Sequence, residues 1–377
     1  MAIAAISFVQ GLQFCVSPVL GQIKEFYSEV PVSLIQMLIT APALLAMAVA
    51  LISGGLVVVI SKKKLLLFSC LVAGITGFLP FLSDSFGLLF FSRMFYGVGL
   101  GLACTLNTAV VAEFFEGDER VSVMGIQAAS IGVGMVIITT LGGSLGTYGF
   151  RATYWINIIA FLSFAVIAAC LPDTGKTQVA GKEKIKLTKE VFQTSFLGFI
   201  EFLFLITFTT NIAMHLSGGL AGNTAVAGVL TGAFSAAQIV VGLILGRITK
   251  LTKSYTLPVA MLSFCVGGIF LILFPSGYAA LILAAVLCGI SQGMFVPQAM
   301  CDVSAAVRPA ATAMAAACVT CFSNMGQVIS PTVLNTAAKL LFGSVTTTNV
   351  YIIATAGMAA AAVIVIIGKI KNMADGG

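Results

Sequence analysis

The sequence predicts an all-α membrane protein with twelve transmembrane helices in two pseudo-symmetric six-helix bundles and with both termini in the cytoplasm. Composition, the distribution of basic residues and an internal repeat support this fold class. Hydrophobic residues make up 59% of the 377 residues and charged residues 8%, so polar groups are too few to cover a water-exposed surface. A hydrocarbon core of roughly 30 Å needs about 20 apolar residues per helix, which leaves room for about a dozen spans.

Apolar runs separated by short polar breaks mark the individual spans. The first run has no basic residue before it and no small-residue cleavage site followed by a soluble body, so we interpret it as a span and not as a signal peptide. The predicted spans are 2–23, 32–60, 64–83, 86–112, 121–146, 151–171, 191–216, 224–246, 255–275, 278–303, 311–336 and 347–368.

The basic residues predict the orientation, because Lys and Arg accumulate in short cytoplasmic loops. With the N-terminus inside, only Lys24, Arg151 and Lys339 fall outside, and Arg93 lies within a span. The net charge of +6 is therefore a topology signal, and no nucleic-acid partner is expected. The inner cations are Lys62, Lys63, Lys64, Arg120, Lys176, Lys182, Lys184, Lys186, Lys189, Arg247, Lys250, Lys253, Arg308, Lys369 and Lys371.

One long polar connection and a repeated glycine pattern divide the chain into halves. Residues 173–190 are predicted to be a cytoplasmic linker between an N-terminal bundle at 1–172 and a C-terminal bundle at 191–377. A constant shift of 192 positions relates glycines of the two halves, and repeated halves around a central path are typical of transporters. The related pairs are Gly97 with Gly289, Gly101 with Gly293, and Gly134 with Gly326.

Two loops, GLVVVISKKK from Gly55 to Lys64 and GLILGRITK from Gly242 to Lys250, resemble a signature of the major facilitator superfamily. In that family the loop after the second span reads Gly, three residues, Asp, a basic residue, any residue, Gly, and two basic residues. The counterpart here is GLVVVISKKK, from Gly55 to Lys64, with Val59 in the acidic position. The second-half copy is GLILGRITK from Gly242, with a further glycine where the acid would be.

Three spans carry further parts of the resemblance, which covers essentially the whole chain and is of the twelve-span, bacterial type. The fourth span reads LFFSRMFYGVGLG, with Arg93 and Gly97 in signature positions. The fifth reads GMVIITTLGG, which keeps Gly134 and the final glycines of the family's antiporter signature but has Ile and Thr where that signature has Gly-Pro. The eleventh has GQVISP, with Gly326 and Pro331 in the equivalent places. This motif favours export.

The resemblance implies secondary transport by alternating access, with several motif residues acting in gating or conformational change. Small residues in these spans also permit close helix approach. The residues with this predicted role are Gly55, Lys63, Gly97, Gly134, Gly242, Arg247, Gly326 and Pro331.

Three ionisable residues are candidates for coupling or for binding substrate charge, because such groups are costly within a membrane. Arg93 is either an anchor for an anionic substrate, a charge that tunes a nearby proton site, or a structural arginine bonded to carbonyls and glutamines. Glu201, near the middle of the seventh span, is either a proton carrier or a glutamate hydrogen-bonded between helices. Asp302, near the cytoplasmic end of the tenth span, is either part of the coupling site or a loop-bracing residue in contact with water.

Amide side chains recur at helical spacing in several spans and are predicted to line a central cavity. Amides also tie membrane helices together, so both interpretations stay open. The predicted cavity-lining residues are Gln10, Gln13, Asn107, Gln127, Gln238, Gln292, Gln298, Asn324 and Gln327.

The sequence therefore predicts a monomeric secondary transporter in the cytoplasmic membrane, in contact with lipid, that moves a small molecule. Proton-coupled efflux of small apolar or amphipathic compounds by an antiporter is the first hypothesis. Uptake, symport or exchange of a small organic anion held by Arg93 is the alternative, and a membrane receptor without transport is a distant one.

An enzyme is not expected, because the chain has one histidine, His215, and neither an HExxH nor a GxSxG motif. No cofactor or metal is expected, since the one C-x-x-C motif lies inside a predicted span without a second pair.

Overall fold

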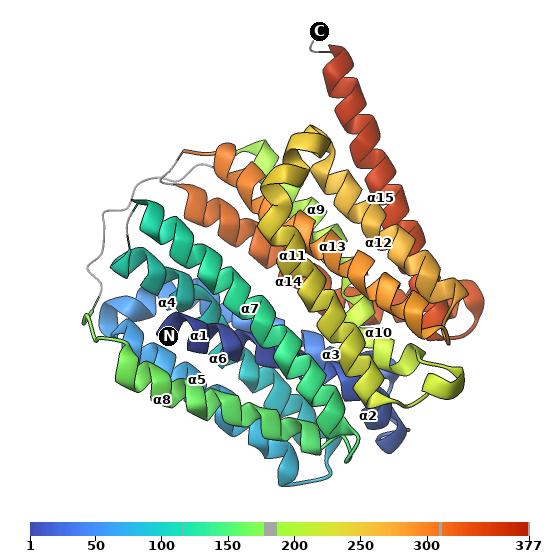
Figure 1. Cartoon of the computed structure of the whole chain (residues 1–377), viewed down its shortest axis with the longest axis horizontal. Helices are drawn as coiled ribbons and strands as arrows, with labels where there is room; N and C mark the ends of the chain where they lie inside the picture. Colours follow the sequence, from blue (N-terminus) through green and yellow to red (C-terminus); the bar gives the residue numbers. More distant parts are fainter. Residues whose placement is uncertain (116, 177–186, 309–310, 376–377) are drawn as a thin grey trace. The chain divides into compact units, whose positions relative to one another are not determined.

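The computed structural model describes residues 1–115, 117–176, 187–308 and 311–375, and within these ranges every regular element is a helix (Figure 1). The chain forms two units. Unit 1 comprises Met1–Lys182 with Asn223–Gly232, and unit 2 comprises Glu183–Gly222 with Ala233–Gly377. The predicted linker falls largely on residues 177–186, which lie outside the described residues together with Lys182, Lys184 and Lys186. The domain boundary at 173–190 therefore stays a prediction.

Unit 1 is built from helices that are apolar because lipid, and not water, covers them. Helices α1 and α7 pack together, α4 and α5 both pack on α6, and α8 packs on α1 and α5. The elements are α1 Ala2–Gly11, η1 Leu12–Phe14, η2 Ser17–Val19, α2 Leu20–Phe26, α3 Val32–Thr40, α4 Pro42–Val59, α5 Lys62–Phe78, η3 Leu79–Phe81, α6 Phe86–Phe114, α7 Gly117–Gly146, η4 Ala152–Asn157 and α8 Ile158–Cys170.

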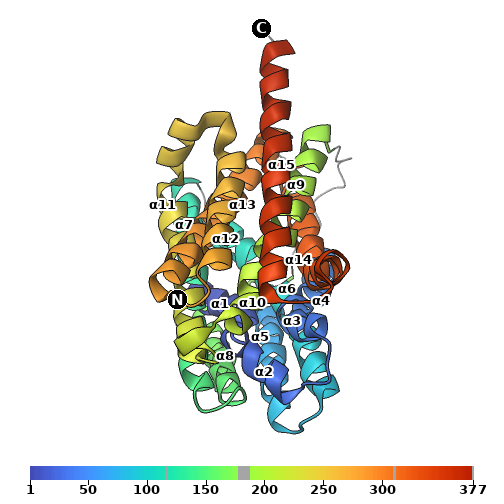
Figure 2. The same ribbon diagram turned by 90° about the vertical axis from the view of Figure 1, so that its right-hand side faces the viewer.

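Unit 2 pairs α9 with α14 and places α12 between α13 and α15. Figure 2 shows α15 beside α12 over much of its length. Helix α11 begins in unit 1 and continues in unit 2. The elements from the end of the linker onward are α9 Lys189–Leu205, α10 Thr207–His215, η5 Gly218–Leu220, α11 Thr224–Thr252, η6 Lys253–Tyr255, α12 Thr256–Leu273, α13 Tyr278–Ala305, α14 Thr312–Phe342 and α15 Thr347–Asp375.

Ten helical stretches of the described chain are long and apolar enough to cross a membrane. The predicted spans 224–246 and 255–275 form one such stretch, Thr224–Leu273, because only the short η6, with Lys253 at a φ of 49°, separates α11 from α12. The predicted span 311–336 lies in α14, which is rich in hydroxyl and amide side chains and is not among the ten. The count of twelve and the orientation of the termini stay predictions.

The glycines that repeat at a shift of 192 positions make equivalent helix–helix contacts in the two units. A Cβ added to Gly97 on α6 would lie 2.2 Å from the Pro42 carbonyl oxygen on α4, and a Cβ on Gly289 would lie 2.2 Å from the Phe234 carbonyl oxygen on α11. The two carbonyls are separated by the same 192 positions as the two glycines. The next pair, Gly101 against Ala46 and Gly293 against Gln238, repeats this contact one turn on.

We expect alanine at Gly97 or Gly289 to destabilise the protein, although alanine favours a helix more than glycine does. The added methyl group meets a backbone carbonyl that cannot move without the helix, and overpacking of this kind costs about 1–3 kcal/mol. Gly55→Ala is the matched control, because no atom lies within 4 Å of a Cβ there. Thermal unfolding in detergent measures the effect, and equal midpoints for all three variants would contradict the contact.

Candidate site: a buried carboxylate and an apolar cavity in unit 2

Glu201 lies on α9 with its side chain fully buried at 0% exposure. The Ser291 hydroxyl on α13 donates a hydrogen bond of 2.7 Å to Glu201 Oε1. Within the described part of the chain, Glu201 Oε2 is buried and has no hydrogen-bond partner. A carboxyl group with one occupied and one unoccupied oxygen, shielded from water, can hold a proton on the second oxygen without losing the bond to Ser291.

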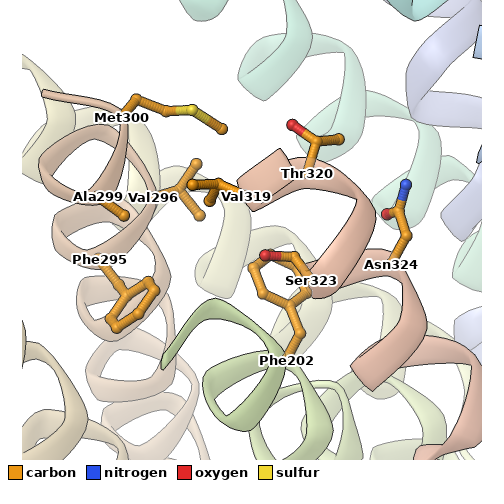
Figure 3. A pocket seen from close by; sticks show the side chains of 9 residues that line it. All are labelled: Phe202, Phe295, Val296, Ala299, Met300, Val319, Thr320, Ser323 and Asn324. Carbon is orange, nitrogen blue, oxygen red and sulfur yellow. The ribbon is translucent and has the colours of Figure 1, made fainter. Parts of the chain in front are cut away.

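A cavity of about 100 Å³ lies between α9, α13 and α14. Figure 3 shows residues of α13 facing residues of α14, with Phe202 of α9 below them. Phe202 follows Glu201 directly on α9, so the same helix turn carries the carboxylate and part of the lining. The lining residues are Phe202, Phe295, Val296, Ala299, Met300, Val319, Thr320, Ser323 and Asn324. The arrangement suits a molecule with an apolar body and one polar edge.

Arg93 in unit 1 is 2% exposed and is bonded to backbone carbonyls. Its Nε donates to the Leu38 carbonyl at 3.0 Å and its Nη2 to the Gln13 carbonyl at 2.6 Å. The guanidinium also lies 5.1 Å from the ring centroid of Tyr96, whose hydroxyl donates to the Val9 carbonyl at 2.5 Å. This geometry matches the structural interpretation of Arg93.

The Gln13 carbonyl lies where the first span is interrupted and breaks into α1, η1, η2 and α2, whereas Leu38 lies on α3. A broken helix leaves carbonyls without their usual amide donors, and these need partners in a membrane. At the break, the Gln13 carbonyl accepts from Arg93 of α6, and the Val9 carbonyl accepts from Tyr96 of α6 in addition to the Leu12 amide. The seventh span breaks 192 positions later, between α9 and α10, where the Thr207 and Ser330 hydroxyls donate to the Phe204 and Leu203 carbonyls.

The predicted cavity-lining amides of unit 1 tie helices together. Their bonds run from Gln10 to the Ala103 carbonyl at 3.2 Å, from Gln13 to the Ile39 carbonyl at 3.0 Å, from Asn107 to the Ser7 hydroxyl at 3.0 Å and from Gln127 to the Thr108 hydroxyl at 3.4 Å. Whether any of these four amides also lines a cavity stays a prediction.

In unit 2 the structure separates the predicted residues further. Asn324 lines the cavity, whereas Gln238 donates to Gln292 at 2.9 Å and Gln298 donates to Asp302 at 2.7 Å. The buried Gln327 has an Nε2 without a partner among the residues that the structure describes. Asp302 is half-buried, as its predicted place near the helix end implies.

The residues predicted to act in gating have unequal surroundings. Gly326 is in close contact with the Phe199 carbonyl, at 2.2 Å from an added Cβ, whereas Gly134 is 3.4 Å from its nearest neighbours. At Gly55 and Gly242, no atom of the described residues lies within 4 Å of an added Cβ. Arg247 is exposed, Pro331 is buried within α14, and Lys63 donates to the Ala168 carbonyl at the end of α8 at 2.8 Å.

A hollow of about 460 Å³ in unit 1 lies where α4 ends and α5 begins, and Val59 and Lys64 are among its lining residues. Asp173 also lines it and supplies a carboxylate near the loop position where Val59 replaces the acid of the family signature. The Gly175 amide donates to Asp173 Oδ1 at 3.1 Å and, with neighbouring lysines, holds the pKa of this carboxyl below its usual value. Lys62 forms a separate 2.8 Å ion pair with Glu113.

Sequence reasoning missed the apolar lining and the partner of Glu201. Phe295 and Ala299 are four residues apart on α13, as are Val296 and Met300, which is the spacing of one helix face. The same spacing describes a face turned to lipid, so the pattern alone did not distinguish the two. Ser291 carried no signal, because a single serine in a span is common.

Two helical units with a repeated glycine contact, a buried carboxylate and an apolar cavity are features that transporters share. The model of the Major Facilitator Superfamily matches residues 2–214. The chain therefore belongs to the Major Facilitator Superfamily, whose members are carriers and not enzymes.

Two curated relatives match parts of the chain. The multidrug transporter AQR1 of Candida glabrata is 26% identical over 136 residues, which are 36% of this chain and 23% of AQR1. The quinolone resistance protein NorA of Staphylococcus aureus is 21% identical over 151 residues, which are 40% of this chain and 39% of NorA. Each match spans less than two thirds of the relative.

Solved structures share the fold over nearly the whole chain. A POT family transporter in complex with 5-aminolevulinic acid has a TM-score of 0.80 at 12% identity and covers 97% of this chain and 95% of its own. The nucleoside transporter NupG has a TM-score of 0.73 at 13% identity and covers 97% of this chain and 99% of its own. At these identities the likeness concerns the fold alone.

Proposed function

We propose that this chain exports small apolar or amphipathic molecules across the cytoplasmic membrane by alternating access, in exchange for protons carried by Glu201. It acts as a monomer surrounded by lipid. The observation that carries the proposal is the buried Glu201 carboxylate, which has one hydrogen bond and one oxygen without a partner in the described chain.

The position of this carboxylate supports coupling. Phe202, the next residue on α9, lines the cavity, so a substrate that displaces the Phe202 ring shifts the helix turn that holds Glu201. Coupling requires only that protonation and substrate occupancy favour different conformations, and a shared helix turn provides that connection.

The cavity lining supports the substrate class. Its side chains are aromatic and aliphatic except for Thr320, Ser323 and Asn324, and none of the lining residues is ionisable. Because ligand sites usually measure about 300–1,000 Å³, the cavity of unit 2 holds only part of a drug-sized molecule. The names of the relatives AQR1 and NorA, a multidrug transporter and a quinolone resistance protein, agree with export of such compounds.

Uptake or exchange of a small organic anion held by Arg93 is the second candidate. In its support, Arg93 has no carboxylate partner among the described residues, whose ion pairs are Lys62–Glu113 and Arg151–Asp84. The two carbonyl bonds of the guanidinium count against it.

Proton flux in proteoliposomes of the purified protein distinguishes the two candidates. A pH dye inside the vesicles is combined with a panel of apolar compounds, organic cations and organic anions. We expect apolar or amphipathic compounds to drive protons in the direction opposite to their own movement. Proton-independent movement of organic anions, with no response to the other classes, would overturn the proposal in favour of the second candidate.

A further inference from the structure

A line of buried polar side chains runs through unit 2 from Glu201 to the end of the unit where α10 stops and α15 begins. Its first part follows α13. Cys288 precedes Ser291 by three residues, so the Cys288 thiol and the Ser291 hydroxyl share one helix face. Cys288 and Ser291 are both 0% exposed.

The second part crosses a pair of glycines on α12. A Cβ on Gly267 would lie 3.0 Å from Cys288 Sγ, and a Cβ on Gly268 would lie 2.1 Å from Thr355 Oγ1 on α15. These two glycines of α12 therefore make room for the thiol of α13 and for the hydroxyl of α15. On the same side of α12, the Cys265 thiol donates to the Thr355 carbonyl at 3.7 Å.

The third part follows α15 to its first residue. Thr347, Tyr351 and Thr355 recur every four residues and share one face. The Tyr351 ring meets the His215 ring edge-on, with 4.8 Å between the ring centroids. His215 Nε2 lies 2.8 Å from the Leu271 carbonyl, which only accepts, so the ring carries its hydrogen on Nε2 and takes the Thr347 hydroxyl on Nδ1 at 2.8 Å. Half-exposed Thr347 is where the line reaches the end of the unit.

Three polar atoms along this line are buried without a hydrogen-bond partner in the described residues, namely Glu201 Oε2, Thr355 Oγ1 and Tyr351 Oη. A buried polar atom left unpaired costs about 1–3 kcal/mol, and ordered water is what pairs such atoms inside proteins. One such atom is a packing defect. Three of them, on α9 and α15 of one unit, suggest a common cause, and ordered water is the group that would pair all three.

We propose that this line is the path by which protons reach Glu201 from the outer aqueous phase, with water bridging Tyr351, Thr355 and the carboxylate. The inference rests on the proposed function of Glu201 and on the predicted topology, which places the α10–α15 junction outside. Each hydroxyl or water receives one proton from the outer side and passes one inward, so the net result is one proton added to Glu201 Oε2. His215 is a positioning residue that holds the Tyr351 ring and the Thr347 hydroxyl.

The test follows the protonation of Glu201 directly, without a substrate. In proteoliposomes, an external pH step from about 8 to about 6 is followed by time-resolved infrared spectroscopy of the protonated-carboxyl band, which Glu201→Gln assigns by removing it. Tyr351→Phe and Thr355→Val each delete a hydroxyl that has no hydrogen-bond partner in the described chain, so we expect the fold to be retained. The matched controls are Tyr154→Phe and Thr40→Val, which delete buried, unpartnered hydroxyls in unit 1.

We expect Tyr351→Phe and Thr355→Val to slow the appearance of the band roughly tenfold without changing its final amplitude, because a proton crosses only hydrogen-bond distances or one water at a time. Both controls keep the wild-type rate. A wild-type rate in the two path variants would overturn the path while leaving Glu201 as the proton carrier. A band that persists in Glu201→Gln would instead overturn the proposed function, and with it the path.

Discussion

Replacing Glu201 by glutamine is expected to abolish uphill transport while leaving substrate exchange across the membrane intact. The amide keeps the size of the side chain and can still accept a hydrogen bond from Ser291, but it cannot gain or lose a proton. A pH difference of about one unit supplies about 1.4 kcal/mol per proton and sustains a roughly tenfold substrate gradient. In the variant we expect no substrate gradient, because binding and conformational exchange continue but are no longer coupled to proton movement.

Glu190→Gln is the matched control, since Glu190 lies on the same helix but is exposed in its first turn. Accumulation of a fluorescent amphipathic substrate in proteoliposomes measures uphill transport, and counterflow of the same substrate measures exchange. A full gradient in Glu201→Gln would remove this residue from the coupling mechanism. Loss of counterflow as well would show that the carboxylate is needed for conformational change and not for protons alone.

Replacing Arg93 by lysine is expected to lower the free energy of unfolding by about 1.5–3 kcal/mol, the contribution of a hydrogen bond from a charged group. The guanidinium reaches two carbonyls at once through Nε and Nη2, and a lysine ammonium is a single point charge on a flexible stem. One carbonyl at the break of the first span is then left unpaired in the membrane. Thermal or denaturant unfolding in detergent measures the loss.

Arg247→Lys is the control for this change, because Arg247 is exposed. The relative affinities for apolar, cationic and anionic compounds are expected to stay the same in Arg93→Lys. A stable variant that loses organic-anion binding alone would reverse the assignment and support the second candidate function. Stability and binding measured together therefore distinguish a structural role of Arg93 from a role in binding an anionic substrate.

The membrane class, the helical fold and the repeat were predictable because they follow from composition and spacing. Burial in lipid requires apolar residues all round a helix, and a duplicated contact keeps its glycines. Gly97 and Gly289 show this, since a backbone carbonyl on the neighbouring helix leaves no room for a side chain. Gly55 and Gly242 belong to the same motif set but have no close neighbour, and nothing in their sequence context distinguished them.

The site was only partly predictable. Glu201 is recognisable in the sequence because a carboxylate in a span is expensive, and Asn324 belongs to a polar stripe. The amides of unit 1 belong to similar stripes, yet they bond to backbone and hydroxyl groups of other helices. Polar periodicity identifies which helix face avoids lipid, but that face meets either a neighbouring helix or a cavity.

By itself, the sequence determined that this protein is a membrane transporter of the major facilitator type, because hydropathy, charge asymmetry and the glycine repeat are properties of the chain. Only the tertiary structure decided which polar groups satisfy one another. Arg93 bonds to the carbonyl of Leu38 on α3 and to that of Gln13 at the break of the first span, whereas Glu201 keeps one oxygen without a partner in the described chain. The physical reason is that a hydrogen bond depends on distance and direction between helices far apart in sequence, which no local pattern encodes.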